Sequence, residues 1–311
     1  NGTLVGEKEM NKRHKMKKMS RDDLIYEIIT KIFLVVVMIV IIYPVYFVLV
    51  ASFSDPIYVN SGEMLFWPKG FTLLGYQRVF KDSRIWIGYR NTIMYTVLGT
   101  ILGVAATMLA AYSLSRKDLP GRKIIMFLFI FTMYFSGGMI PYYLVVKGLG
   151  LVNSRTLMIL SGAVSVYNII IARSFLEANI PEELKDAASI DGCGNARFFA
   201  QIVIPLSKAV IAVIALYLAV SYWNSYFNAM IFLTDTDKYP LQLYLRQILL
   251  TVSESASMDS SLDPQALIQL QQMGQVIKYG VIVVATVPII CVYPFIQKYF
   301  VKGVMIGSVK G

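Results

Sequence analysis

Six long stretches without a charged residue divide this chain and limit what it can fold into. Each stretch is rich in apolar side chains and has between 17 and 26 residues. The stretches are 32–54, 91–115, 124–146, 156–172, 209–234 and 279–297. A helix needs about 20 apolar residues to cross a bilayer, and it satisfies its own backbone hydrogen bonds there. The sequence therefore predicts an all-α polytopic membrane protein with six transmembrane helices.

The basic residues are distributed unevenly between the segments that connect these stretches. If the N-terminus is cytoplasmic, the inner segments carry 19 of the 29 Lys and Arg residues, and the outer segments carry 10. Basic loops stay in the cytoplasm, so both termini are predicted there. Residues 1–27 then form a basic cytoplasmic segment, and residues 28–311 form the membrane domain. Because the basic residues flank predicted spans, the net charge of +10 does not indicate nucleic-acid binding.

Several functional classes are disfavoured by what the sequence lacks. The only histidine, His14, lies in the N-terminal segment, and the six apolar stretches contain no ionisable Asp, Glu, Lys, Arg or His. An ion-coupled transporter is expected to carry such groups within its spans. The chain also has no phosphate-binding G-x-x-x-x-G-K-[ST] loop, no catalytic triad and no cluster of metal ligands. We therefore expect neither an enzyme nor a cofactor-binding chain, and energy must come from another protein unless the chain is a passive pore.

The inner connection 173–208 has the pattern of two short helices separated by glycines. Pro181 suits the start of a helix, and the two glutamates that follow it suit the first turn. Four residues share one face of this helix by their spacing: Leu184, Ala187, Ala188 and Asp191. Gly192 is expected to end the helix, and Pro205 to open the fifth span. The predicted fold thus has a small amphipathic helix between spans four and five.

This connection also contains a spaced motif, E-A-A-x3-G-x9-I-x-L-P. The matching positions are Asp186, Ala187, Ala188, Gly192, Ile202, Ile204 and Pro205. Aspartate replaces glutamate at the first position, and isoleucine replaces the leucine before the proline. With these two mild departures, the segment resembles the cytoplasmic loop of permease subunits in ABC importers.

The resemblance implies a role for this loop. In that family the loop forms a coupling helix that docks into a cleft of a nucleotide-binding subunit. It implies a coupling segment at 176–205, with Glu183 and Asp191 inside the docking helix. It also implies that two partner subunits bind ATP and Mg, whereas this chain binds no cofactor. The alternative from the residues alone is an interfacial helix that rests on lipid headgroups.

Other stretches resemble the carbohydrate-importing branch of these permeases, from about residue 28 to the end. They are ASFSDP at 51–56, RNTIMYTV at 90–97, YWNSYFNAMIFL at 222–233, YPLQLYLRQIL at 239–249 and QKYFVKGVMIGSVKG at 297–311. The third and fourth stretches look most like a subgroup often associated with complex oligosaccharides and polysaccharide fragments. The resemblance implies a bacterial plasma-membrane protein that works with a second homologous permease and an extracytoplasmic solute-binding protein. A permease for peptides or amino acids and a passive channel are the alternatives.

Two spans contain the residue types that bind sugars. Sugars are held by hydrogen bonds to polar side chains and by stacking on aromatic rings. The candidates are Tyr134, Ser136 and Tyr142 in the third span and Tyr222, Trp223, Asn224, Tyr226 and Asn228 in the fifth. Gly137, Gly138 and Pro141 should kink the third span, and Asn224 and Asn228 are expected to share a helix face. The alternative for each aromatic residue is packing or an interfacial belt.

Gly99 and Gly103 in the second span form a G-x-x-x-G pattern. Small residues at this spacing favour close helix packing, either within the subunit or against a partner. The outer segments 55–90 and 235–278 are candidate landing surfaces for the binding protein, or ordered surface loops.

Overall fold

The structure is a computed structural model that describes residues 21–255, 274, 277–291 and 294. Among these residues it contains helices, turns and connecting segments but no strand, which confirms the all-α prediction for this part of the chain. Residues 1–20 and 295–311 lie outside the described residues, so the predicted position of both termini remains a prediction. The same holds for the similarity at 297–311.

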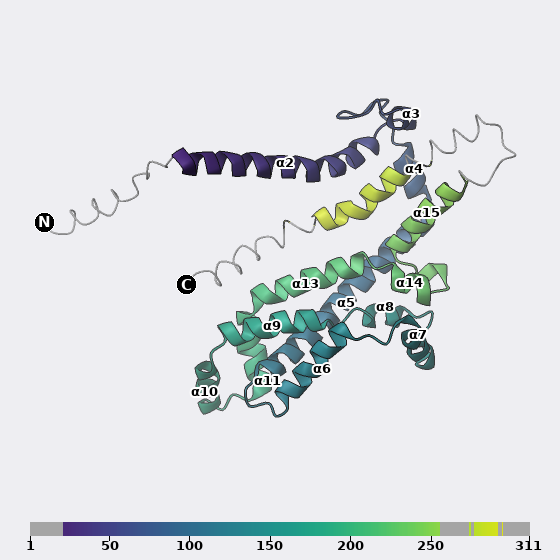
Figure 1. The fold of residues 1–311 in the computed structure, drawn as a ribbon. Helices are drawn as coiled ribbons and strands as arrows, with labels where there is room; N and C mark the ends of the chain where they lie inside the picture. Colours follow the sequence, from purple (N-terminus) through teal and green to yellow (C-terminus); the bar gives the residue numbers. More distant parts are fainter. Residues whose placement is uncertain (1–20, 256–273, 275–276, 292–293, 295–311) are drawn as a thin grey trace.

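Helix α2 (Arg21–Ala51) extends away from the other helices (Figure 1). It continues through the predicted boundary at residue 28, and its apolar window has no buried residue. Its contacts with other segments lie toward its C-terminal end, where Val50 and Ala51 pack with Met64, Phe47 lies against Tyr279, and Tyr43 against Phe66. A helix that is apolar on all sides requires lipid or another protein around it.

Helix α5 (Ser83–Ser115) is the central element of the fold. Helices α9 (Val166–Asn179) and α13 (Lys208–Trp223) pack along it. Gly99 and Gly103 bring α13 very close: a Cβ on Gly99 would lie 2.2 Å from Cζ of Tyr222, and one on Gly103 would lie 2.7 Å from Leu218. The G-x-x-x-G pattern is therefore used for packing within this subunit.

The third apolar stretch consists of two helices at a sharp angle. Helix α6 (Arg122–Tyr134) and helix α7 (Met139–Gly148) are bent by 114°. The chain turns at Gly138, whose φ of 84° favours glycine. This confirms the predicted break, but Pro141 lies inside α7, so the glycines rather than the proline interrupt the helix.

The fourth and fifth stretches are also interrupted, so a single helix over 156–172 or 209–234 is wrong. Helix α8 (Arg155–Leu160) ends before α9, where the Ser165 side chain accepts a hydrogen bond from the Asn168 N–H and starts a new helix. Helix α13 ends at Trp223, and α14 (Phe227–Phe232) follows it.

Two described helices, α2 and α5, are long and apolar enough to cross a membrane. Two bent helix pairs raise the number to four if each pair counts as one span. These pairs are α6 with α7, and residues 195–206 with α13, which are bent by 81°. The apolar helix Ile277–Cys291, here called the C-terminal helix, is shorter. The structure thus supports a membrane protein, and the count of six spans remains a prediction.

The remaining elements are short. They are α3 (Pro56–Asn60), α4 (Leu74–Lys81), α10 (Glu182–Ile190), α11 (Asn195–Phe198), the π-helical turn η1 (Phe199–Val203), α12 (Ile204–Leu206), the 3-10 turn η2 (Thr236–Lys238) and α15 (Leu241–Ser255). Helix α10 and the turn 116–121 lie at one end of the bundle, here called the coupling end (Figure 1). Helices α4 and α15 lie at the opposite end, so segments predicted on one side of the membrane lie together.

Candidate functional site

Helix α10 is shaped by its two ends. Glu182 and Glu183 occupy its first turn directly after Pro181, where acids are favourable to the helix dipole. At the other end, the Cys193 N–H donates to the Ala188 carbonyl (2.9 Å), and the Gly192 N–H donates to the Ser189 carbonyl (3.0 Å). This pair of bonds is a Schellman motif, in which Gly192 adopts a φ of +73°. The glycine of the motif therefore has a structural role in ending the helix.

The motif residues divide into two groups by burial. Ala188 is only 9% exposed, and it packs with the partly buried Ile202 and Ile204 against the core formed by α5, α9 and α13. The others face outward and are exposed: Glu183, Asp186, Ala187, Asp191, Gly192 and Pro205. Ile190 lies among the outward residues and is 87% exposed. One side of α10 is therefore fixed to the bundle, whereas the other presents small, acidic and apolar groups.

The second half of the connection 173–208 differs from the prediction where it joins the fifth span. Residues 195–206 form α11, η1 and α12 in continuous sequence, and the chain bends by 81° into α13. Pro205 lies before this bend, inside α12, and the span begins at Lys208. The bend lies at the buried Ser207, whose N–H donates to the carbonyls of Val203 and Ile204. Pro205 therefore precedes the fifth span rather than opening it.

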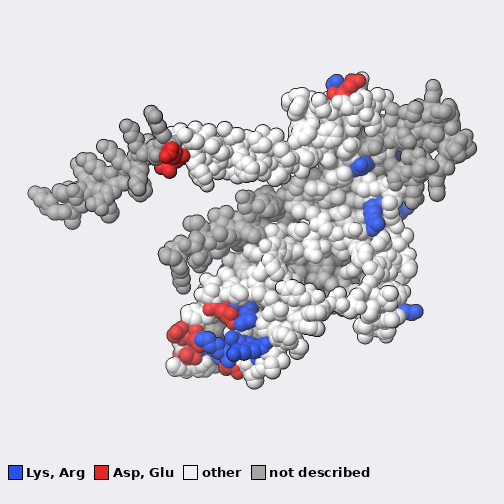
Figure 2. Space-filling model, in the orientation of Figure 1, with Lys and Arg blue, Asp and Glu red and all other residues white. Residues whose placement is uncertain are grey.

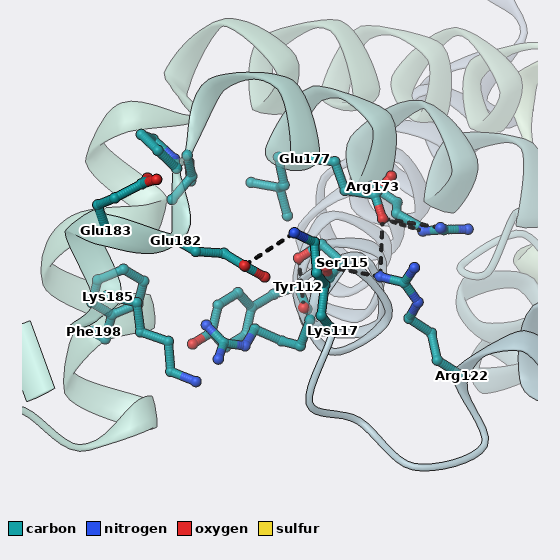
Figure 3. A pocket seen from close by; sticks show the side chains of 14 residues that line it. Tyr112, Ser115, Lys117, Arg122, Arg173, Glu177, Glu182, Glu183, Lys185 and Phe198 are labelled. Atoms are coloured by element: carbon teal, nitrogen blue, oxygen red, sulfur yellow. Dashed lines mark hydrogen bonds and ion pairs between the residues drawn. The ribbon is translucent and has the colours of Figure 1, made fainter.

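Ion pairs connect α10 to the turn between α5 and α6. Lys117 Nζ lies 3.0 Å from Glu182 Oε2, and Lys185 Nζ lies 2.9 Å from Asp118 Oδ2 (Figure 3 shows the first pair). Arg116 also pairs with Asp118, at 3.0 Å. The Lys117–Glu182 and Lys185–Asp118 pairs each join residues more than 60 positions apart, and they hold α10 at two points. We call the pairs Lys117–Glu182 and Lys185–Asp118 the α10 clamp.

A second group of ion pairs lies beside the clamp. Glu177 accepts from Arg173 at 2.9 Å and from Arg122 at 3.4 Å, and Arg122 also donates to the Ser115 carbonyl at 3.3 Å (Figure 3). Between the two groups lies a cleft of about 490 Å³. Its wall combines basic and acidic side chains with Tyr112 and Phe198. The charges of this end are therefore largely neutralised within the chain.

The outward acids of α10 are not neutralised in this way. Glu183, Asp186 and Asp191 form no ion pair with any residue in the described part of the chain. Figure 2 shows the acidic and basic side chains gathered at this end of an otherwise mostly uncharged surface. Exposed carboxylates beside Ala187 and Ile190 suit a partner that offers basic groups and a small apolar pocket.

The opposite end contains a polar junction that the sequence reading did not identify. The buried Asn91 donates to the carbonyls of Asp237 (2.8 Å) and Tyr239 (3.0 Å). The buried Thr92 hydroxyl accepts from the Leu241 N–H at 2.8 Å. These bonds join the family-like stretches 90–97 and 239–249. We call this junction of Asn91, Thr92 and residues 237–241 the α15 latch.

Asn153, in the turn before α8, binds the segment 235–238 that leads into the latch. The Asn153 side chain accepts from the N–H of Asp235 (3.1 Å), and Lys238 Nζ donates to the Asn153 carbonyl (2.9 Å). Asp235 in turn accepts the N–H of Asp237, and this bond, followed by the contact with Lys238, lowers the pKa of Asp235. A polar residue inside an apolar stretch, such as Asn91, was the sequence signal for this junction.

The candidate path residues of the third stretch lie around the α6–α7 break. Tyr134 is 78% exposed, and Ser136 is also exposed. Tyr142 packs edge-on against Phe232, with 5.4 Å between ring centres, and remains partly exposed. These side chains are available to a ligand in the isolated subunit.

Two candidates of the fifth stretch are packing residues instead. Tyr222 is 5% exposed, packs on Gly99 and donates its hydroxyl to the carbonyl of Ile159. Trp223 donates its indole N–H to the Ala285 carbonyl at 3.0 Å and lies beside Tyr89. Their polar groups are already bonded within the bundle, so we leave both out of the path proposed below.

The expectation that Asn224 and Asn228 share a helix face is wrong. Helix α13 ends before Asn224, and α14 begins only at Phe227. Asn224 donates to the Val220 carbonyl at 2.9 Å, whereas Asn228 points toward the Ser161 hydroxyl at 3.4 Å. An asparagine competes with the helical backbone for hydrogen bonds, which favours a helix end at this position. Tyr226 lies in the break and is exposed.

Comparison with known proteins identifies the family. Residues 99–306 match the family described as "Binding-protein-dependent transport system inner membrane component". The chain belongs to this family. It is a membrane permease component, and its matched region includes the coupling segment, residues 237–241 of the latch and all candidate path residues, whereas Asn91 and Thr92 precede it.

Individual relatives extend the similarity over nearly the whole permease. The polygalacturonan/rhamnogalacturonan transport system permease protein YtcP of Bacillus subtilis (strain 168) is 42% identical over 95% of this chain and 100% of its own length. Protein LplC of the same strain is 40% identical over 87% of this chain and 90% of its own. A solved bacterial ABC transporter involved in the import of the acidic polysaccharide alginate includes a chain with a TM-score of 0.80 and 32% identity, covering 92% of this chain and 100% of that one.

Proposed function

We propose that this permease pairs with a second permease to form the path of an ATP-driven carbohydrate importer, and that residues 176–205 receive the force from ATP hydrolysis. The observation that carries the proposal is the division of α10 into two faces. One face is fixed to the bundle through Ala188 and the α10 clamp, whereas Glu183, Asp186 and Asp191 face outward without an intrachain ion pair among the described residues.

This arrangement suits the transmission of movement. A helix that is pinned at two points moves with the α5–α6 turn, so a displacement of α10 also displaces α5 and α9. The π-helical turn and the 81° bend connect the same segment to α13. A partner that grips the outward face can therefore act on three helices of the bundle at once.

The proposed partner for this face is a nucleotide-binding subunit with basic groups around an apolar pocket. Ala187 permits close approach, Ile190 fills the pocket, and the acids pair with the basic rim. The coupling end then lies in the cytoplasm, which agrees with its richness in Lys and Arg. ATP and Mg would be bound by that subunit, and no catalytic role is assigned to this chain.

The proposed cargo is an oligosaccharide. The relatives whose names specify a cargo transport glycans: polygalacturonan and rhamnogalacturonan for YtcP, and alginate for the solved transporter. In this chain we place the path along polar and aromatic residues near the helix breaks. They are Tyr134, Ser136, Tyr142, Asn224 and Tyr226, which are exposed, and Asn228, which is half-buried. Helix breaks at membrane depth are typical of transporter binding sites.

The test is uptake by the reconstituted complex, with the companion permease, the ATPase subunits and the binding protein in liposomes. We expect uptake of an oligosaccharide that needs ATP on the side of the coupling end and is absent with a non-hydrolysable ATP analogue. The loaded binding protein should raise ATP hydrolysis, because coupling between sites is reciprocal.

Three outcomes would overturn the proposal. Uptake that needs no ATPase subunit would indicate a passive channel. ATP-dependent uptake of peptides or amino acids, but of no glycan, would leave an importer with a different cargo. An α10 that cross-links to lipid but not to an ATPase subunit would remove the coupling role.

A further inference from the structure

A groove at the opposite end contains a cation that no described acidic side chain neutralises. The groove has a volume of about 430 Å³, within the range of about 300–1,000 Å³ that small-molecule sites occupy. Its walls come from the end of α13, the break before α14, helix α15 and the C-terminal helix. The polar lining consists of Asn224, Tyr226, Gln242, Arg246 and Thr286, and the rest is aliphatic.

Arg246 has almost no polar partner among the described residues. A guanidinium group carries five N–H donors in a planar fork. Its one hydrogen bond in the described part of the protein goes from Nη1 to the Met230 sulfur at 3.0 Å, and a thioether is a weak acceptor. No carboxylate of the described residues forms an ion pair with it.

The guanidinium also lies over an aromatic ring. Its central carbon is 5.0 Å from the ring centre of Tyr226, which is a cation–π contact. Apart from the bond of Nη1 to Met230, the N–H donors of Arg246 have no acceptor among the described residues. The half-buried position of Arg246 strengthens any pairing there, because solvent screens it less than an exposed pair.

Hydrogen bonds hold the helices that form the two walls around Arg246. The α15 latch fixes the start of its helix, with the Leu241 N–H bonded to the buried Thr92 hydroxyl. The opposite wall is held by Trp223, which bonds the Ala285 carbonyl of the C-terminal helix. A site on elements held in this way keeps its geometry when a ligand arrives, which lowers the cost of binding.

We propose that this groove, the Arg246 pocket, binds a uronate residue of an acidic oligosaccharide, with Arg246 as the carboxylate-binding residue. The inference rests on the proposed function and specifies its substrate class. A carboxylate accepts two parallel hydrogen bonds from a guanidinium, and one positive charge matches one negative charge. The amides of Asn224 and Gln242 suit sugar hydroxyls. Gln242 makes no side-chain hydrogen bond with another described residue.

The chemistry favours a sugar acid over other anions. A phosphate carries more charge and is usually held by several cations or a row of backbone N–H groups, whereas the described lining offers a single cation. A neutral sugar would leave the N–H fork of Arg246 without an acceptor, and that is costly in a partly desolvated groove.

The test uses the assembled transporter in nanodiscs without the binding protein, so that the binding protein's own preference does not contribute. Calorimetry would compare trigalacturonate with the same trimer methyl-esterified at its carboxyl groups. We expect tighter binding of the acid, and about a 10- to 100-fold loss of that affinity in Arg246→Gln with no change for the ester. Arg246→Lys should retain part of the affinity, because it keeps the charge but loses the fork.

Arg78→Gln is the matched control, because it removes an exposed arginine of α4 at the same end. It should leave the affinities for acid and ester unchanged. Equal binding of acid and ester by the native complex, no binding of either, or an equal loss of both in Arg246→Gln would overturn the inference. ATP-driven uptake of an acidic oligosaccharide that is indifferent to Arg246→Gln would do so as well, and would leave the permease function standing.

Discussion

The two ends of this permease use charged residues differently. At the coupling end, basic and acidic groups are abundant and most pair with each other, as in the α10 clamp and the pairs of Glu177. At the opposite end, ion pairs such as Arg84–Asp82 and Lys238–Asp235 are local in sequence, and neutral hydrogen bonds of Asn91 and Thr92 join distant segments. Arg246 lies in its groove there without a described acidic partner.

The comparison indicates how to distinguish architecture from function in this fold. Charges that are paired within the chain fix the position of a helix, and each exposed pair contributes only about 0.2–1 kcal/mol. Four of the charges without an ion pair among the described residues, those of Glu183, Asp186, Asp191 and Arg246, lie where another molecule is proposed to bind. The four predictions below test this distinction, beginning with the largest expected effect.

Ala187→Arg should abolish ATP-dependent uptake. Ala187 is exposed on the outward face of α10, so the substitution leaves the fold intact but buries an unpaired charge at the proposed interface. An uncompensated buried charge costs about 3–5 kcal/mol, which is a hundredfold or more in affinity. Co-purification with the ATPase subunit measures the effect, and Ala187→Ser is the control that retains binding. Normal co-purification of Ala187→Arg would mean that this face is not the docking surface.

Gly99→Val should destabilise the bundle between the two ends. A Cβ at this position overlaps the Tyr222 ring, so α5 and α13 must separate, which costs about 1–3 kcal/mol or more. Thermal unfolding in detergent should show a lower midpoint together with weaker uptake. Gly148→Ala, with no atom within 4 Å of the new Cβ, is the control and should behave like the native chain. An unchanged midpoint for Gly99→Val would contradict the observed packing.

Tyr222→Phe should reduce stability while uptake specificity stays unchanged. The substitution removes the hydrogen bond to Ile159, worth about 0.5–1.5 kcal/mol, but retains the ring that packs on Gly99. Tyr226→Ala is the contrast, because it removes an exposed ring from the proposed path and should weaken uptake without lowering the unfolding midpoint. If Tyr222→Phe changed the preference among sugars at unchanged stability, Tyr222 would belong to the path after all.

Glu182→Lys should have the smallest effect of the four substitutions, a modest weakening of the coupling between ATP hydrolysis and uptake. It replaces an exposed attraction to Lys117 with a repulsion, a change of up to about 1 kcal/mol. Uptake should fall a few-fold at low salt and less at high salt. The double variant with Lys117→Glu restores the pair in reverse and should recover uptake. No recovery in the double variant would show that Glu182 contacts the partner rather than α10's own support.

Two residues of the coupling motif are unsuitable for a mutational test of docking. A spaced motif alone would select Ala188 and Gly192 for mutation. Ala188 is buried in the core, and Gly192 holds a left-handed conformation in the Schellman motif. A large residue at either position would damage the fold, so loss of transport would not report on docking.

The sequence by itself determined the class of the protein. Long runs without charge leave few alternatives to membrane helices, because unpaired backbone groups are costly in lipid. The pattern around Pro181 and Gly192 also located α10 correctly, because both residues act on their immediate neighbours. The family-like stretches led to the same family that the comparison with known proteins shows.

Only the tertiary structure decided where the helices break and which residues meet. The run 209–234 has no charged residue, so its charge pattern does not reveal the break after Trp223, and Asn224 and Asn228 were wrongly placed on one face. The α15 latch and the α10 clamp join residues that are 60 to 150 positions apart, and local patterns carry no information on such contacts. Burial has the same origin, because whether Tyr222 faces a ligand or a glycine depends on the helix packed against it.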